Sequence, residues 1–180
     1  MRIRGALAVL CVLAALVGCS DDPEPLTLPP ITSASPSPLV VPLPSEAAAE
    51  TPEGAAAFAR YFFGEVVDGA YVDLNAEPVV ALSTEQCDSC KNIVDDIERL
   101  RDAGLIVAGE RFKIAFAEAP PVNADGSVIV DFRFTSDPYV ERNAEGEVVR
   151  QEDAQVDQDA QVKLVRREGG WAVDAIRTVE

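Results

Sequence analysis

The sequence predicts an α+β fold for residues 52–180, with N-terminal helices packed on an antiparallel sheet of about four strands. Two observations lead to this prediction. Apolar residues recur at helical spacing in two segments between positions 51 and 103. After Gly104 the apolar period changes to two, and short turn signals separate the alternating segments. Helices followed by consecutive strands with tight turns are typical of α+β domains.

The first helix is expected to begin after Thr51, because Thr51 suits the N-cap and Pro52 suits the first helical position. Gly69 and the stretch Asn-Ala-Glu-Pro at 75–78 are expected to break the helical pattern. The apolar stripe consists of Ala55, Phe58, Ala59, Phe62 and Val66. Tyr61, Phe62 and Phe63 are interpreted as core and helix-packing residues. The short apolar segment 78–82 is compatible with a helical turn or with a brief strand, and the residues leave that choice open.

The second helix is predicted to start at a capping box. Ser83 and Gln86 have the required spacing, with Ser83 as the N-cap. The helix is expected to run to about Ala103 and to stop at Gly104. Its apolar side contains Cys87, Cys90, Val94 and Ile97, flanked by Ile93 and Leu100.

Four alternating segments predict the sheet. The first places Phe112, Ile114 and Phe116 on one face, and the second does the same for Val128, Val130, Phe132 and Phe134. The third contains Val156, Ala160, Val162 and Leu164, and the fourth contains Trp171 and Val173. One face is therefore expected to pack on the helices, while the other carries charged side chains such as Asp131 and Asp174.

The N-terminus has the pattern of an export signal. A positively charged start precedes an apolar run over residues 5–17, which is too short to span a membrane as a helix. The sequence "LVGC" at positions 16–19 resembles the lipobox of bacterial lipoproteins. This resemblance implies that residues 1–18 are a cleaved signal peptide and that Cys19 carries a lipid. The alternative is an uncleaved apolar anchor, or an ordinary signal peptide with a chance cysteine.

Residues 19–51 are expected to form the lipid anchor and a disordered, proline-rich tether, and 52–180 a single domain. Eight of the thirteen prolines lie between residues 20 and 51, a density that favours extended polyproline II. A spacer between membrane and domain is the favoured interpretation, and a motif for a proline-recognising partner is the alternative. The lipid would hold the protein on the extracytoplasmic face of the cell membrane.

The C-terminal hairpin "VKLVRREGGWAVDAI" follows two helices, and this order resembles the nuclear-transport-factor-2-like superfamily. That resemblance implies a cone-like α+β domain with a curved sheet. The stretches "TPEGAAAFARYFF" and "ALSTEQCDSC" also resemble an actinobacterial lipoprotein family of unknown function. This second resemblance covers residues 51–180, has the paired cysteines as its clearest mark and implies no activity.

Cys87 and Cys90 allow three interpretations. A zinc site needs about four ligands, and the chain has neither a second cysteine pair nor any histidine. A thioredoxin-like redox centre would need positive charge beside the thiol, whereas Asp88 and other acids crowd Lys91. A disulfide is favoured, because an exported domain meets an oxidising environment and the two thiols have only each other.

Other kinds of site are less supported. The net charge of −16 argues against nucleic-acid binding. The acidic residues Glu152, Asp153, Asp157 and Asp159 lack the spacing of a calcium loop and are interpreted as a solvated face. No cofactor is predicted. In catalytic cone folds an acid, histidine or tyrosine projects into the cavity, but Asp131 and Asp174 are expected to point away from it.

These observations favour a non-enzymatic lipoprotein that is tethered outside the cell membrane. Its partners are expected to be the membrane, through the lipid on Cys19, and an unknown protein or small apolar ligand. An extracytoplasmic thiol–disulfide oxidoreductase using Cys87 and Cys90 is the alternative. A cone-fold enzyme is a third hypothesis, for which the sequence offers no arrangement of nucleophile and base.

Overall fold

The structure, a computed structural model, describes residues 42–108 and 112–179. The chain divides after Ser37, and the described residues all belong to the second unit, Pro38–Glu180. The expected signal peptide, Cys19 and most of the expected tether lie outside the described residues. None of the described helices combines the length and apolar character that crossing a bilayer requires.

Two antiparallel sheets form the strand layer of the second unit. The larger has the order β2-β3-β6-β7, with β2 Lys113–Glu118, β3 Ser127–Ser136, β6 Gln155–Arg167 and β7 Gly170–Thr178. The smaller has the order β1-β4-β5, with β1 Ile106–Ala108, β4 Tyr139–Arg142 and β5 Val148–Glu152. The predicted α+β class is confirmed, and each of the four alternating segments forms a strand of the larger sheet. The smaller sheet was not predicted.

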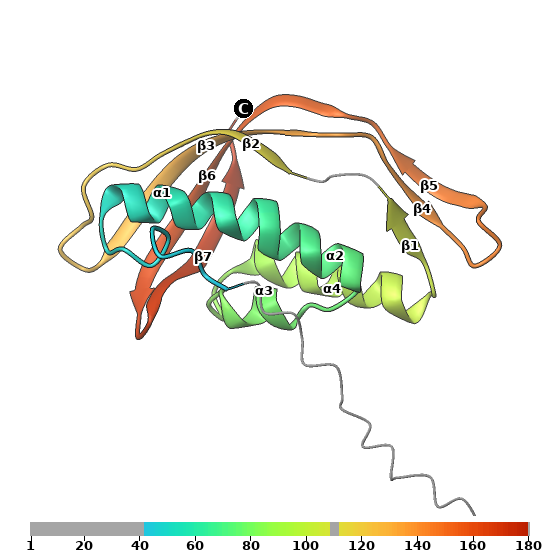
Figure 1. Cartoon of the computed structure of the whole chain (residues 1–180), viewed down its shortest axis with the longest axis horizontal. Helices are drawn as coiled ribbons and strands as arrows, with labels where there is room; N and C mark the ends of the chain where they lie inside the picture. The colour runs from blue at the N-terminus through green and yellow to red at the C-terminus, as the bar shows by residue number, and fades with distance from the viewer. Residues whose placement is uncertain (1–41, 109–111, 180) are drawn as a thin grey trace, which may run out of the picture. The chain divides into compact units, whose positions relative to one another are not determined.

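One long hairpin contributes to both sheets. β3 pairs with β6, and their continuations β4 and β5 pair with each other (Figure 1). Asp137 and Pro138 separate β3 from β4. Proline has no N–H to give to a ladder, so it interrupts the pairing at this point. The hairpin then bends, and its far end forms the smaller sheet with β1.

The first helical stretch continues through Gly69 and ends just before the break predicted at 75–78. α1 (Pro52–Tyr61) continues through a π-helical segment, η1 (Phe62–Val67), into α2 (Asp68–Asp73). The break expected at Gly69 is absent, whereas the break expected at 75–78 is confirmed. Glycine costs only about 1 kcal/mol relative to alanine inside a helix, and the following Ala70 and Tyr71 are buried. The stretch ends instead at Leu74, whose φ is 51°.

The predicted capping box at Ser83 is also wrong. α4 (Asp88–Asp102) begins later, with Cys87 as its N-cap. The backbone at Ser83 forms a parallel bridge with Val173, in which Thr84 N donates to Val173 O at 2.8 Å and Val173 N donates to Leu82 O at 2.9 Å. This pairing holds the segment extended. For the segment 78–82 the sequence allowed a helical turn or a brief strand. The structure has a helical turn there, α3 (Glu77–Ala81).

The helices cover one face of the larger sheet (Figure 1). α1 contacts β2 and β3, and α4 contacts β7. The side chains that meet between the layers alternate along the strands as predicted, with one exception. They are Val128, Val130, Phe132 and Phe134 on β3, Ala160, Val162 and Leu164 on β6, and Trp171 and Val173 on β7. The expectation that Val156 shares this face is wrong, because Val156 lies at the register shift opposite Phe134 and Ser136 and is 65% exposed. This arrangement of helices on the inner face of an antiparallel sheet agrees with the cone-like fold that the resemblance implied.

Strand β2 departs from the predicted alternation. Its register with β3 shifts between Ile114 and Phe116, so that Phe116 lies opposite Arg133 and Ala117 lies opposite Phe132. A bulge of this kind turns the following side chains to the other face. Phe116 is therefore 46% exposed on the outer face, and Ala117 takes the buried position. The expectation that Phe112, Ile114 and Phe116 share one face is wrong for Phe116.

Candidate functional site

Aromatic side chains fill the space between the helices and the larger sheet. Phe63 lies 4.6 Å from Phe132 and 5.7 Å from Phe112, and Phe112 lies 5.3 Å from Phe134, measured between ring centroids. Tyr61, Phe62 and Phe63 are at most 5% exposed, which confirms their predicted place in the core. Close-packed rings of this kind leave the inner face of the sheet as core, and not as a ligand pocket.

The disulfide favoured by the sequence is present between Cys87 and Cys90. Cys87 Sγ also accepts a hydrogen bond from Cys90 N at 3.2 Å, so the pair joins the N-cap of α4 to its first turn. Both cysteines are at most 2% exposed. Lys91, the nearest base in sequence, binds Asp88 at 2.8 Å. The pair thus braces the start of a helix, and the antiparallel strands that follow give it no thioredoxin-like surroundings.

An open groove of about 260 Å³ lies beside the disulfide. Val80 from α3 and Val94 from α4 line it with the two cysteines, and Val80 is 57% exposed. The hydroxyl of Thr84, which also lines the groove, donates to Asp174 at 2.8 Å and is thus already used within the protein. We regard the groove as the seam between two helices.

A buried carboxylate that sequence reasoning missed lies in the smaller sheet. Glu141 on β4 is 2% exposed, and Arg99 from α4 donates to both of its oxygens, at 2.8 and 3.2 Å. Arg99 also donates to Asp96 Oδ1, and Arg150 on β5 lies 3.6 Å from Glu141. Hydrogen bonds to Glu141 and Asp96 raise the pKa of Arg99 above its ordinary value, so its charge is permanent. Because arginines occupy both oxygens of Glu141, this network acts as a tie between β4, β5 and α4.

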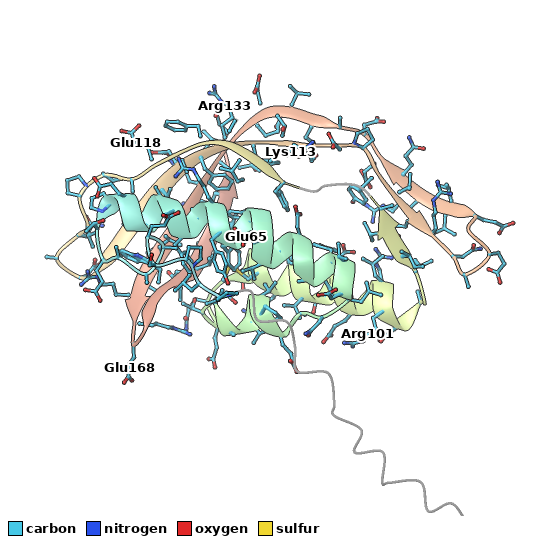
Figure 2. The ribbon with its side chains drawn as sticks, viewed as in Figure 1. Glu65, Arg101, Lys113, Glu118, Arg133 and Glu168 are labelled. Atoms are coloured by element: carbon cyan, nitrogen blue, oxygen red, sulfur yellow. A yellow bond between two sulfur atoms is a disulfide. The ribbon has the colours of Figure 1, made fainter. Side chains whose placement is uncertain are left out.

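The outer face of the larger sheet carries charged side chains, as predicted. Arg133 on β3 binds Asp159 on β6 through two hydrogen bonds of 2.8 and 3.0 Å. Gln161 donates to Asp131 Oδ1 at 2.8 Å, so Asp131 points away from the core. In Figure 2, Glu118 and Arg133 project from the side of the sheet opposite α1. The hydrogen bonds from Arg133 lower the pKa of Asp159 below its ordinary value.

Two open hollows adjoin each other on this outer face, and Phe116 and Asp131 line both. The first has about 380 Å³ and is also lined by Arg133, Asp159, Gln161 and Val179, among others. The second has about 410 Å³ and adds Glu118, Ala119 and Pro120. We call the surface formed by Phe116, Glu118, Asp131, Arg133, Asp159 and Gln161 the outer-face surface. Aromatic side chains are enriched in protein–protein interfaces.

The other residues considered from the sequence are dispersed. Asp174 accepts hydrogen bonds from Lys163 and Thr84, which lower its pKa, Lys163 making the larger contribution. Of the acidic residues 152–159, Glu152 pairs with Arg150 and Asp159 with Arg133. Within residues 42–108 and 112–179, no three potential metal ligands of the types His, Cys, Asp and Glu come together.

Solved structures of very different sequence are similar to this chain. The intermembrane space region of chloroplast protein ARC6 is 12% identical, with a TM-score of 0.51 over 69% of this chain and 95% of that one. An uncharacterised protein with a cystatin-like fold from Caulobacter vibrioides is 15% identical, with a TM-score of 0.42 over 71% and 92% of the two chains. Aln2 from a Streptomyces species is 16% identical, with a TM-score of 0.43 over 76% and 93%.

No curated protein matches the sequence. Residues 34–177 match a protein family described as "Family of unknown function (DUF6318)". The match spans the whole of the described helices and nearly all of the strands. The chain therefore belongs to this family of unknown function.

Proposed function

We propose that the chain is a lipid-anchored module on the extracytoplasmic face of the cell membrane, which acts by binding a protein and not by catalysis. The observation that carries the binding part is the position of the aromatic side chains. Phe63, Phe112 and Phe132 occupy the inner face with rings in contact, which leaves little room for a small apolar ligand. Phe116, in contrast, is turned outward among ordered polar groups.

The anchoring part is supported by the sequence. The lipobox-like "LVGC" at 16–19 and the proline-rich stretch after it suit a domain held at a distance from the membrane. A tethered module of this kind meets its partners at a raised local concentration, so a modest contact surface is sufficient for function.

The anchor is tested by Cys19→Ala. We expect the wild-type chain in the membrane fraction and most of the Cys19→Ala chain in the soluble fraction, because the lipid site is gone. An antibody against the domain measures the total amount of the variant, so that poor expression is not mistaken for loss of anchoring. Retention of Cys19→Ala in the membrane fraction would contradict the proposal.

The binding surface is tested by photo-crosslinking in cells. A photo-crosslinking amino acid replaces Phe116 on the outer-face surface or, as the matched control, Val149 on β5, which is 52% exposed. We expect a discrete crosslinked protein from position 116 that position 149 does not yield. Equal patterns from the two positions would argue against the outer-face surface as the binding site.

A further inference from the structure

We propose that the partner segment bound at the outer-face surface is cationic, that is, a lysine- or arginine-rich stretch of a protein. This inference rests on the proposed function and specifies the chemistry of its partner. Its starting point is a pair of like charges. Glu118 on β2 and Asp131 on β3 lie directly opposite each other in the register, and both side chains are exposed on the outer face.

Like charges placed directly opposite in an antiparallel pair destabilise the sheet. In the part of the chain that the structure describes, neither Glu118 nor Asp131 forms an ion pair with a lysine or arginine. Arg133, two positions from Asp131 on β3, is bound to Asp159 by two hydrogen bonds. Gln161 donates to one oxygen of Asp131 but brings no charge. No described lysine or arginine therefore neutralises this pair, and a bound cationic group would gain from both carboxylates.

The hollow at this pair has a matching shape and composition. It is lined by Phe116, Glu118, Ala119, Pro120 and Asp131, and so combines two carboxylates with an exposed ring and apolar surface. The methylene stem of a lysine or arginine packs on such a ring while its charged end reaches the carboxylates. The net charge of −16 adds a long-range attraction for cationic segments.

Charge also decides against other occupants. A second copy of this chain would bring its own Glu118 and Asp131 against this surface, and the like charges would repel. An anionic segment is disfavoured for the same reason. A divalent cation would find two carboxylates here, with no third acidic ligand grouped with them among the described residues.

The test measures binding of fluorescently labelled hexalysine to the lipidated chain in neutral detergent micelles, by anisotropy at low salt. Glu118→Gln/Asp131→Asn is expected to weaken binding about tenfold, because two charge pairs with lysines of the peptide are lost. The matched control, Glu145→Gln/Glu168→Gln, removes two exposed acids that lie in turns outside the outer-face surface. It is expected to change binding less than about threefold. Phe116→Ala is expected to weaken binding about threefold without a change in charge.

Stability serves as a second measurement. Because the Glu118–Asp131 repulsion is removed, Glu118→Gln/Asp131→Asn is expected to melt at the same temperature as the wild type or higher. Lost binding with a raised melting temperature supports the proposal, since misfolding is then excluded as the cause. Equal loss of hexalysine binding in the two double variants would overturn it, because binding would follow net charge alone.

Two further outcomes are decisive. Calcium binding that is measured calorimetrically and lost in Glu118→Gln/Asp131→Asn would make this an ion site and overturn the cationic segment. If hexalysine does not bind but position 116 still crosslinks a protein in cells, the cationic inference fails while the proposed function stands. If both experiments fail, both proposals fall.

Discussion

Individual residues carry the clearest functional information in this molecule. Phe116 belongs by alternation to the core, but a register shift of one position in β2 turns it outward. Bulges are common beside functional sites, where they redirect a side chain. The exposed aromatic ring, the opposed carboxylates and the neighbouring ion pair all meet because of this one irregularity.

The position of Phe116 is testable against that of Phe132. Phe132 is 3% exposed and its ring stacks on Phe63, so Phe132→Ala is expected to lower the free energy of unfolding by about 3–5 kcal/mol. Phe116→Ala is expected to cost at most about 1 kcal/mol, because its ring is half exposed. Denaturant unfolding compares the two. Similar losses of unfolding free energy in the two variants would indicate that Phe116 also belongs to the core.

At the scale of elements, helix boundaries follow contacts that lie far away in sequence. Gly54 lies in the first turn of α1, and a β-carbon there would lie 2.0 Å from the carbonyl oxygen of Ala49. The same oxygen accepts a hydrogen bond from Trp171 Nε1 at 2.9 Å. The segment before α1 is therefore held between the helix and β7, and glycine is what permits the close approach.

We expect Gly54→Ala to lower the free energy of unfolding by about 1–3 kcal/mol, because the new methyl group displaces Ala49 and its bond to Trp171. Gly69→Ala is the matched control. It is helical with nothing within 4 Å of the added carbon, so it is expected to add about 0.5–1 kcal/mol. Thermal or denaturant unfolding is expected to show a loss of stability for Gly54→Ala and a gain for Gly69→Ala. A stabilising Gly54→Ala would contradict the described packing.

The disulfide belongs to the same scale, because it braces the start of α4. Cys87→Ser/Cys90→Ser is expected to lower the free energy of unfolding by about 2 kcal/mol, in keeping with the small loop that the bond closes. We expect no insulin-reducing activity from the reduced wild type above that of this variant. Such an activity, lost in the variant, would favour the thiol–disulfide alternative over the brace.

At the scale of the whole domain, the Arg99–Glu141 contact joins the smaller sheet to α4. Among the described residues, Arg99→Met leaves the buried carboxylate of Glu141 with an ion pair to Arg150 alone, at 3.6 Å. We expect a loss of about 2–3 kcal/mol in the free energy of unfolding, since buried charges are costly without partners. Arg101→Met, which removes an arginine whose side chain is 51% exposed, is expected to cost less than about 1 kcal/mol. Equal losses would mean that the tie contributes nothing specific.

The sequence by itself determined the features that depend on local spacing. The helical stripe from Ala55 to Val66, the alternation along β3 and the turn signals between strands each repeat within a few residues, so they were visible before any contact was known. The pairing of Cys87 with Cys90 was also visible, because the two thiols are neighbours in the chain. These local patterns were sufficient to predict the fold class.

Only the tertiary structure decided the rest, because each remaining feature depends on a distant partner. The register of β2 on β3 turned Phe116 outward, and pairing with Val173 kept Ser83 out of the helix. Arg99 reaches across 42 positions to Glu141. The charge repulsion between Glu118 and Asp131 likewise exists only once two strands align. Backbone hydrogen bonds and charge pairs between segments outweigh local preference at these points, and no spacing rule within one segment records them.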